Sequence, residues 1–188
     1  MSIENFSDRA IFISEFLHYF LLYHSVELYI VAFSLSLLLI QCFIDLQSRL
    51  LPDIGNLALG SLGLTFHALP DPPILSPFDL LLGALTGAAS LYLIRFVFLR
   101  FAGREALGLG DVKFAAAAGI WVGAPALPTL FFLAATLTLL ALPIRALLRR
   151  RAGTTEPADP EIPFGPGLCA ATAIVVGMQL AGLPVPPL

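Results

Sequence analysis

The chain has 188 residues, enough for one compact domain, but its composition is unlike that of a soluble protein. Hydrophobic residues make up 58% of it and charged residues 12%, whereas charged residues make up about 25% of an average soluble domain. The net charge of −3 comes without a basic stripe that could neutralise a phosphate backbone, so we expect no nucleic-acid partner. We predict an all-α protein whose solvent is lipid.

Residues 1–25 are predicted to be an N-terminal lead-in to the membrane domain. They carry Glu4 and Asp8 where a secretory signal would carry positive charge, so we expect the first apolar span to remain in the mature protein. Residues 9–23 place aromatic and aliphatic side chains at helical spacing. This spacing fits either an amphipathic helix on the membrane surface or a simple lead-in helix.

Residues 26–188 are predicted to form a membrane-embedded domain. Its first apolar run, Val26–Ile44, is long enough to cross the hydrocarbon layer. A polar interruption then ends in a proline. After it we expect a short second span, a proline-rich loop and a third span, at Ile54–Leu69, Pro70–Pro77 and Phe78–Leu99.

The stretch Phe114–Leu142 fits either one overlong helix or two short spans divided at Gly123–Pro128. Loops rich in lysine and arginine stay on the cytoplasmic side of a membrane. With two spans, every basic residue except Arg9 falls on one face, an asymmetry that a single span would destroy. We therefore predict about six transmembrane helices, of which Phe164–Leu183 is the last.

Two carboxylates stand at the ends of predicted spans. Asp45 closes the first span and Asp111 opens the fourth, and six spans put both at the cytoplasmic end. Neighbouring carboxylates share a proton, so that one can act as a base on water and the other as an acid. Taken singly, each has a structural explanation, because acids cap helices and favour helix starts. Gly108 and Gly110 beside Asp111 would let an extended substrate backbone approach.

The other polar residues have simpler expected roles. Lys113 is either a cytoplasmic anchor or an active-site partner, Asp53 caps the second span, and Arg95 reaches the lipid headgroups. Cys42 and Cys169 are expected to be separate buried thiols rather than a disulfide. The histidines show no metal-binding spacing, so we predict neither a metal nor a cofactor.

Three sequence blocks resemble the type IV prepilin peptidases, membrane aspartic peptidases of the GxGD class. They occur in family order and read DLQSRLLPD at Asp45–Asp53, GLGDVKFAAAAGIWVG at Gly108–Gly123 and EIPFGPGL at Glu161–Leu168. Asp45 and Asp111 match the two catalytic aspartates of that family. The resemblance implies cleavage of a prepilin or pseudopilin leader after a glycine, at the cytoplasmic boundary of the bacterial inner membrane, in type IV pilus or type II secretion systems.

The chain departs from the longer, bifunctional members of this family in one respect. It lacks their paired CxxC motifs, so we expect a compact peptidase without the associated methyltransferase activity. Two other functions remain open on the residues alone. Membrane acids also serve small proton-coupled transporters, and the small-residue helix after Asp111 would suit a non-catalytic membrane subunit. The sequence does not indicate the oligomeric state.

Overall fold

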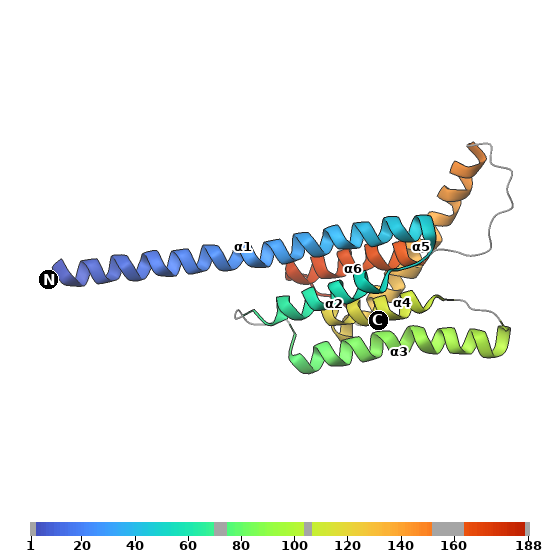
Figure 1. Cartoon of the computed structure of the whole chain (residues 1–188), viewed down its shortest axis with the longest axis horizontal. Helices are drawn as coiled ribbons and strands as arrows, with labels where there is room; N and C mark the ends of the chain where they lie inside the picture. Colours follow the sequence, from blue (N-terminus) through green and yellow to red (C-terminus); the bar gives the residue numbers. More distant parts are fainter. Residues whose placement is uncertain (1–2, 70–74, 104–106, 152–163, 187–188) are drawn as a thin grey trace. The chain divides into compact units, whose positions relative to one another are not determined.

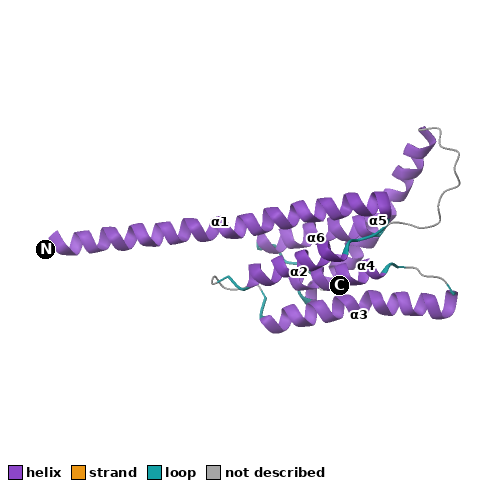
Figure 2. Cartoon of the chain, viewed as in Figure 1, coloured by secondary structure: helices purple, strands orange, loops and turns teal. Residues whose placement is uncertain are grey.

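The computed structural model of the chain describes residues 3–69, 75–103, 107–151 and 164–186. Every regular element in these ranges is helical, which confirms the all-α prediction (Figure 2). The elements are α1 (Ile3–Ser48), α2 (Asp53–His67), α3 (Pro77–Ala102), α4 (Leu109–Val122), the short 3-10 helix η1 (Ala124–Ala126), α5 (Leu127–Arg151) and α6 (Gly165–Leu180). Residues 70–74 of the predicted proline-rich loop at Pro70–Pro77 lie outside the described residues.

The chain divides into two compact units, Met1–Ser34 and Leu35–Leu188. Helix α1 runs without a break through residue 25, where the lead-in was predicted to end. Whether residues 1–25 form a separate functional part stays a prediction. Both predicted catalytic residues belong to the second unit.

Among the residues that the structure describes, three helical segments are long and apolar enough to cross a membrane. They are Ser25–Ser48, Pro77–Ala102 and Ala124–Ile144, and the shorter α6 is also apolar. Large apolar side chains on these segments are exposed, among them Leu39, Phe78 and Phe132. Such a surface is unfavourable in water but suits hydrocarbon, so the chain has the features of a multi-pass membrane protein.

The stretch predicted as either one helix or two is divided, as expected, near Gly123. Helix α4 ends at Val122, and Gly123 takes a left-handed φ of 75° that glycine adopts without strain. A Cβ at Gly123 would also lie 3.0 Å from the side chain of Leu75. The turn η1 then leads directly into α5, so the single overlong helix is excluded.

Helix α4 is the centre of the unit and packs against α2, α3 and α6 (Figure 1). Small residues allow this packing: a Cβ at Gly83 of α3 would lie 2.2 Å from the carbonyl oxygen of Gly119 in α4. On the α2 side, the indole nitrogen of Trp121 donates a hydrogen bond to the Leu59 carbonyl at 2.9 Å, and its ring stacks on Phe66. These contacts hold α4, and therefore Asp111, in place.

Candidate active site

Asp111 lies in the first turn of α4 and is half-buried. Its Oδ2 accepts a hydrogen bond from the backbone N–H of Gly108 at 3.2 Å, which is the bond by which an acid stabilises a helix start. Asp111 therefore stabilises the start of α4, as expected for an acid at a helix start. One such bond leaves the carboxylate with further acceptor sites, so capping does not prevent a chemical role.

Asp45 lies in the last turns of α1 and is only 4% exposed. Its carboxyl group lies directly against Gly165, the first residue of α6, where an added Cβ would be 2.6 Å from both Cγ and Oδ2. Only glycine fits at position 165 while Asp45 keeps this position. The third sequence block therefore contributes to the site by leaving room for the carboxylate.

Asp45 and Asp111 lie on different helices, α1 and α4, and the charge of Asp45 acts on Asp111. That the two carboxyl groups share a proton stays a prediction. The charges of Asp45 and Asp111 also act on the Cys169 thiol of α6. The surroundings of the two acids differ: Asp45 is enclosed, whereas Asp111 is more accessible. Such a difference pushes paired carboxyl groups towards unequal roles.

The two glycines before Asp111 have different surroundings. A Cβ at Gly110 would lie 3.1 Å from the Leu51 Cβ and 3.2 Å from the Leu51 carbonyl oxygen, so a side chain there would push away the segment before α2. A Cβ at Gly108 would meet nothing closer than Asp111 Oδ2 at 3.6 Å, an ordinary contact. Close packing against Leu51 thus explains why residue 110 is a glycine. The approach of a substrate backbone to either glycine stays a prediction.

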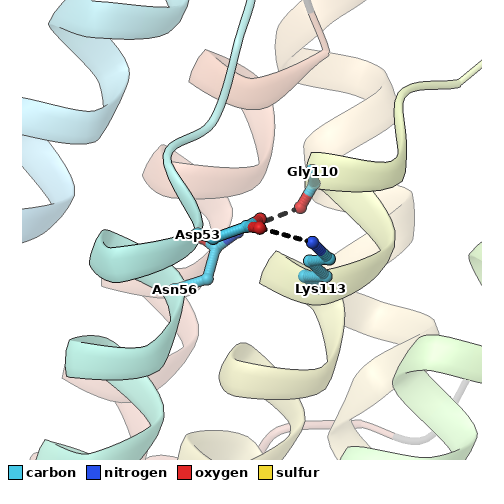
Figure 3. A network of polar contacts seen from close by, with 4 residues as sticks. All are labelled: Asp53, Asn56, Gly110 and Lys113. Carbon is cyan, nitrogen blue, oxygen red and sulfur yellow. Dashed lines mark hydrogen bonds and ion pairs between the residues drawn. The ribbon is translucent and has the colours of Figure 1, made fainter.

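A polar network joins the start of α2 to the start of α4 (Figure 3). Lys113 Nζ donates to Asp53 Oδ2 at 2.6 Å, and Asn56 Nδ2 donates to the Gly110 carbonyl at 3.2 Å. The Lys113 and Asp53 side chains are 51% and 70% exposed, so their ion pair contributes roughly 0–1 kcal/mol. Asn56, in contrast, is buried, and its bond holds the residue next to Asp111.

The structure corrects the expected roles of Asp53 and Arg95. Asp53 was predicted to cap the second span, but Pro52 occupies the N-cap position and Asp53 is the first helical residue, where it favours the helix through the dipole. Arg95 was predicted to reach the headgroups. Its Nη1 instead donates to the Leu107 carbonyl at 2.6 Å and ties α3 to the residue before Gly108.

Sequence reasoning missed three groups beside the two acids. Gln41, one helical turn before Asp45, is fully buried. Cys42 and Cys169 were expected to be unrelated, yet helices α1 and α6 bring them close enough to interact with each other. The spacing of four residues between Gln41 and Asp45, which puts both on one helix face, was the available signal. Within the described ranges no group of three His, Cys, Asp or Glu residues could hold a metal ion.

Comparison with known proteins adds the identity of the family. The model of the type IV leader peptidase family matches residues 32–143. A prepilin leader peptidase/N-methyltransferase of Pectobacterium carotovorum subsp. carotovorum is 39% identical over 148 residues, which cover 79% of this chain and 50% of the relative. The protein of the same name in Klebsiella pneumoniae is 44% identical over 100 residues, covering 53% of this chain and 43% of the relative. No solved structure matches the chain significantly.

A shorter relative matches over most of its own length. The leader peptidase HopD of Escherichia coli is 37% identical over 131 residues, which cover 70% of this chain and 81% of the relative. The chain otherwise spans about half the length of the first curated relatives it matches. The match to the family model covers more than half of the chain and includes both Asp45 and Asp111. The chain therefore belongs to the type IV leader peptidase family.

Proposed function

We propose that this chain is a membrane aspartic endopeptidase that removes the leader of a prepilin or pseudopilin, with Asp45 and Asp111 as its catalytic carboxylates. The observation that carries the proposal is the interaction between these two carboxylates in a chain of the type IV leader peptidase family. The relatives' names, prepilin leader peptidase and leader peptidase, support the same class of substrate. Cleavage after a glycine is the specificity that the sequence resemblance implies.

The chemistry follows from two close carboxyl groups that hold one proton between them. The ionised group takes a proton from water as the water oxygen attacks the peptide carbonyl, and the protonated group donates to the carbonyl oxygen. Collapse of this tetrahedral intermediate, with proton transfer to the amide nitrogen, releases the leader and the new N-terminus. Neither a covalent enzyme adduct nor a cofactor is needed. Because a helix hides its carbonyls, the substrate must be extended where it is cut.

We further propose that α1 to α6 cross the bacterial inner membrane and that both carboxylates lie at its cytoplasmic side. The gathering of lysine and arginine at one end of six spans supports this arrangement. Helices α2 and α4 have 15 and 14 residues, which is about 21–23 Å at 1.5 Å per residue and less than the ~30 Å of a typical hydrocarbon layer. The longer helices around them would provide the lipid-facing surface.

This topology can be tested by replacing Cys42 and Cys169 with alanine and labelling single introduced cysteines with a membrane-impermeant reagent in intact cells. The variants are Arg100→Cys, near the end of α3, and Gly182→Cys, just after α6. With six spans, we expect labelling of Gly182→Cys from outside and labelling of Arg100→Cys only after the membrane is opened. Labelling of both positions from the same side would contradict the six-span arrangement.

The proposed activity is tested by cleavage of candidate prepilins in membranes, with product detected by gel mobility. We expect the wild type to cleave and both Asp45→Ala and Asp111→Ala to be inactive. The matched control is Asp79→Ala, because Asp79 also accepts a hydrogen bond from the backbone of a helix N-cap residue, Ser76 at the start of α3. Folded wild type that cleaves no tested prepilin would contradict the proposed function. Retained cleavage by either dyad variant would contradict the assignment of that residue.

A further inference from the structure

Arg95 is a charged side chain on a helix that is apolar enough to cross a membrane. It lies in α3 and is half-buried. A cation within such a helix is costly, and an arginine near the end of a span ordinarily extends towards the headgroups. Arg95 Nη1 instead donates to the Leu107 carbonyl oxygen at 2.6 Å, a short bond of the charge-assisted kind. A neutral donor could also tie α3 to residue 107, so the charge of Arg95 needs a further explanation.

The carbonyl group that accepts from Arg95 belongs to the same peptide unit as the N–H that donates to Asp111. This unit joins Leu107 to Gly108 and is trans. Its N–H donates to Asp111 Oδ2 at 3.2 Å. In a trans peptide the C=O and the N–H point in opposite directions. The Arg95 guanidinium and the Asp111 carboxylate therefore lie at the two ends of one peptide dipole.

This arrangement transmits the charge of Arg95 towards Asp111. A cation at the carbonyl oxygen polarises the peptide and strengthens the bond that its N–H donates, and such a bond favours the charged form of a carboxyl group. The two hydrogen bonds and the peptide unit between them put Arg95 Nη1 within about 8 Å of Asp111 Oδ2. Because Gly108 is exposed, solvent screens part of this attraction, so the effect is smaller than that of a direct ion pair.

Other ionisable side chains reach the start of α4 from several helices: Asp45 from α1, Asp53 from α2, Lys113 from α4 itself and Cys169 from α6. Asp45 presents a like charge to Asp111, and Cys169 is a free, buried thiol. The charge of Lys113 is matched by that of Asp53 at 2.6 Å. Among the contacts of the described residues, the bond from Arg95 is the one that links a cation to Asp111 through a hydrogen-bonded peptide.

We propose that Arg95 is a positioning residue of the active site, which acts on Asp111 through the Leu107–Gly108 peptide and favours the ionised carboxylate. This inference rests on the proposed peptidase function, because it assigns the two roles within the dyad. Asp111 is the base. Asp45 is only 4% exposed and holds the proton of the pair, since enclosure disfavours a charged carboxylate.

The protons of the reaction balance under this assignment. The Asp111 carboxylate takes a proton from the attacking water while Asp45 gives its proton to the peptide carbonyl oxygen, so the intermediate has two hydroxyl groups. As the C–N bond breaks, Asp111 gives its proton to the amide nitrogen and Asp45 takes one back from a hydroxyl group. The dyad ends with the one proton with which it began.

The protonation of Asp111 can be measured without substrate. Aspartate labelled with 13C at the carboxyl carbon gives an Asp111 signal, which Asp111→Asn assigns and which is followed over a pH series. In Arg95→Met we expect the Asp111 titration to move to higher pH by about 0.5–1 unit, less than the 1–3 units of a direct ion pair. The matched control is Arg100→Met, which removes an exposed arginine from the same helix and should titrate like the wild type.

The same substitution should change the pH dependence of cleavage. The acid limb of the profile reports protonation of the base, so in Arg95→Met it should move to higher pH with the Asp111 signal. Below the optimum we then expect kcat to fall about three- to tenfold with KM within about twofold. Arg95→Lys keeps the positive charge and a donor, so its profile should lie closer to that of the wild type than the profile of Arg95→Met.

A purely structural tie predicts a different result. If Arg95 only holds the segment before α4 in place, Arg95→Met will lower the thermal midpoint and lower kcat equally at every pH, and the Asp111 titration will match that of Arg100→Met. That result overturns the proposal. If Arg95→Met does not fold, Arg95→Gln, which keeps a neutral donor, takes its place in the titration. Folded wild type that cleaves no tested prepilin would instead contradict the proposed function, and the titration would still decide whether Arg95 acts on Asp111.

Discussion

Helices α3 and α4 begin with the same local arrangement but have different surroundings. In α3, Asp79 Oδ2 accepts from the backbone N–H of Ser76 at 3.2 Å, and in α4, Asp111 Oδ2 accepts from the backbone N–H of Gly108 at the same distance. Asp79 also binds the Ser76 hydroxyl, whereas Asp111 faces the charge of Asp45. The two acids therefore accept the same backbone bond, but α3 adds a cap from the Ser76 side chain, and only Asp111 has a second carboxylate acting on it.

The sharpest test of this comparison is a double dissociation between activity and stability. We expect Asp111→Ala to lower prepilin cleavage by roughly 10²–10⁴-fold. Its thermal midpoint should be unchanged or higher, because removing repulsion with Asp45 offsets the lost bond from the Gly108 backbone. Asp79→Ala should leave cleavage within about twofold but cost about 1 kcal/mol of stability through the lost cap. Activity assays and thermal unfolding of purified protein measure both effects. Equal losses of cleavage activity in Asp111→Ala and Asp79→Ala would show that Asp111 has no special role in catalysis.

A second test addresses the contact between Gly165 and the Asp45 carboxyl group. Gly165→Ala would place a Cβ 2.6 Å from the Asp45 carboxyl group, so we expect at least about tenfold lower kcat together with a stability loss of about 1–3 kcal/mol from overpacking. Gly177→Ala on the same helix is the control, because a Cβ there meets nothing within 4 Å. If Gly165→Ala has the activity of the control, Asp45 does not need its present position for catalysis.

The pH dependence of cleavage reports whether the two acids act as one unit. A pair that shares a proton is active when it holds one proton, so activity should fall both below and above an optimum. Asp45→Asn replaces one carboxyl group, and its residual cleavage should lose one limb of that profile. The measurement is the initial cleavage rate over a pH series at fixed substrate concentration. A profile that keeps its shape after the substitution would contradict a shared proton.

The smallest effect is expected at the exposed ion pair between α2 and α4. Lys113→Met and Asp53→Asn should each change cleavage by about threefold or less, because an exposed pair contributes roughly 0–1 kcal/mol. A double-mutant cycle on unfolding free energy measures their coupling. A loss of activity in Lys113→Met far larger than in Asp53→Asn would show that Lys113 acts on the substrate or the dyad rather than through Asp53.

Local features of the sequence predicted the helical fold and identified both acids, but not their surroundings. Hydrophobic runs are local signals, and so are the glycine and prolines near residue 123. The structure has helices where the hydrophobic runs predicted them and a break at Gly123. The contact between Asp45 and Gly165 and the bond from Arg95 to Leu107 join distant segments. Periodicity contains no information on such pairs. Asp53 was misassigned as a cap because the preceding proline takes that position, and helix ends are the least certain boundaries in any sequence prediction.

The backbone contact between Gly83 and Gly119 has a mechanical consequence. With a prospective Cβ only 2.2 Å from the opposing carbonyl oxygen, α3 and α4 touch main chain to main chain and cannot slide past each other without collision. The bond from Arg95 to Leu107 adds a second tie between the same two segments. We therefore expect α3 and α4 to move together, with Asp111 attached to them. An opening that admits a peptide is then expected to involve the helices on the Asp45 side.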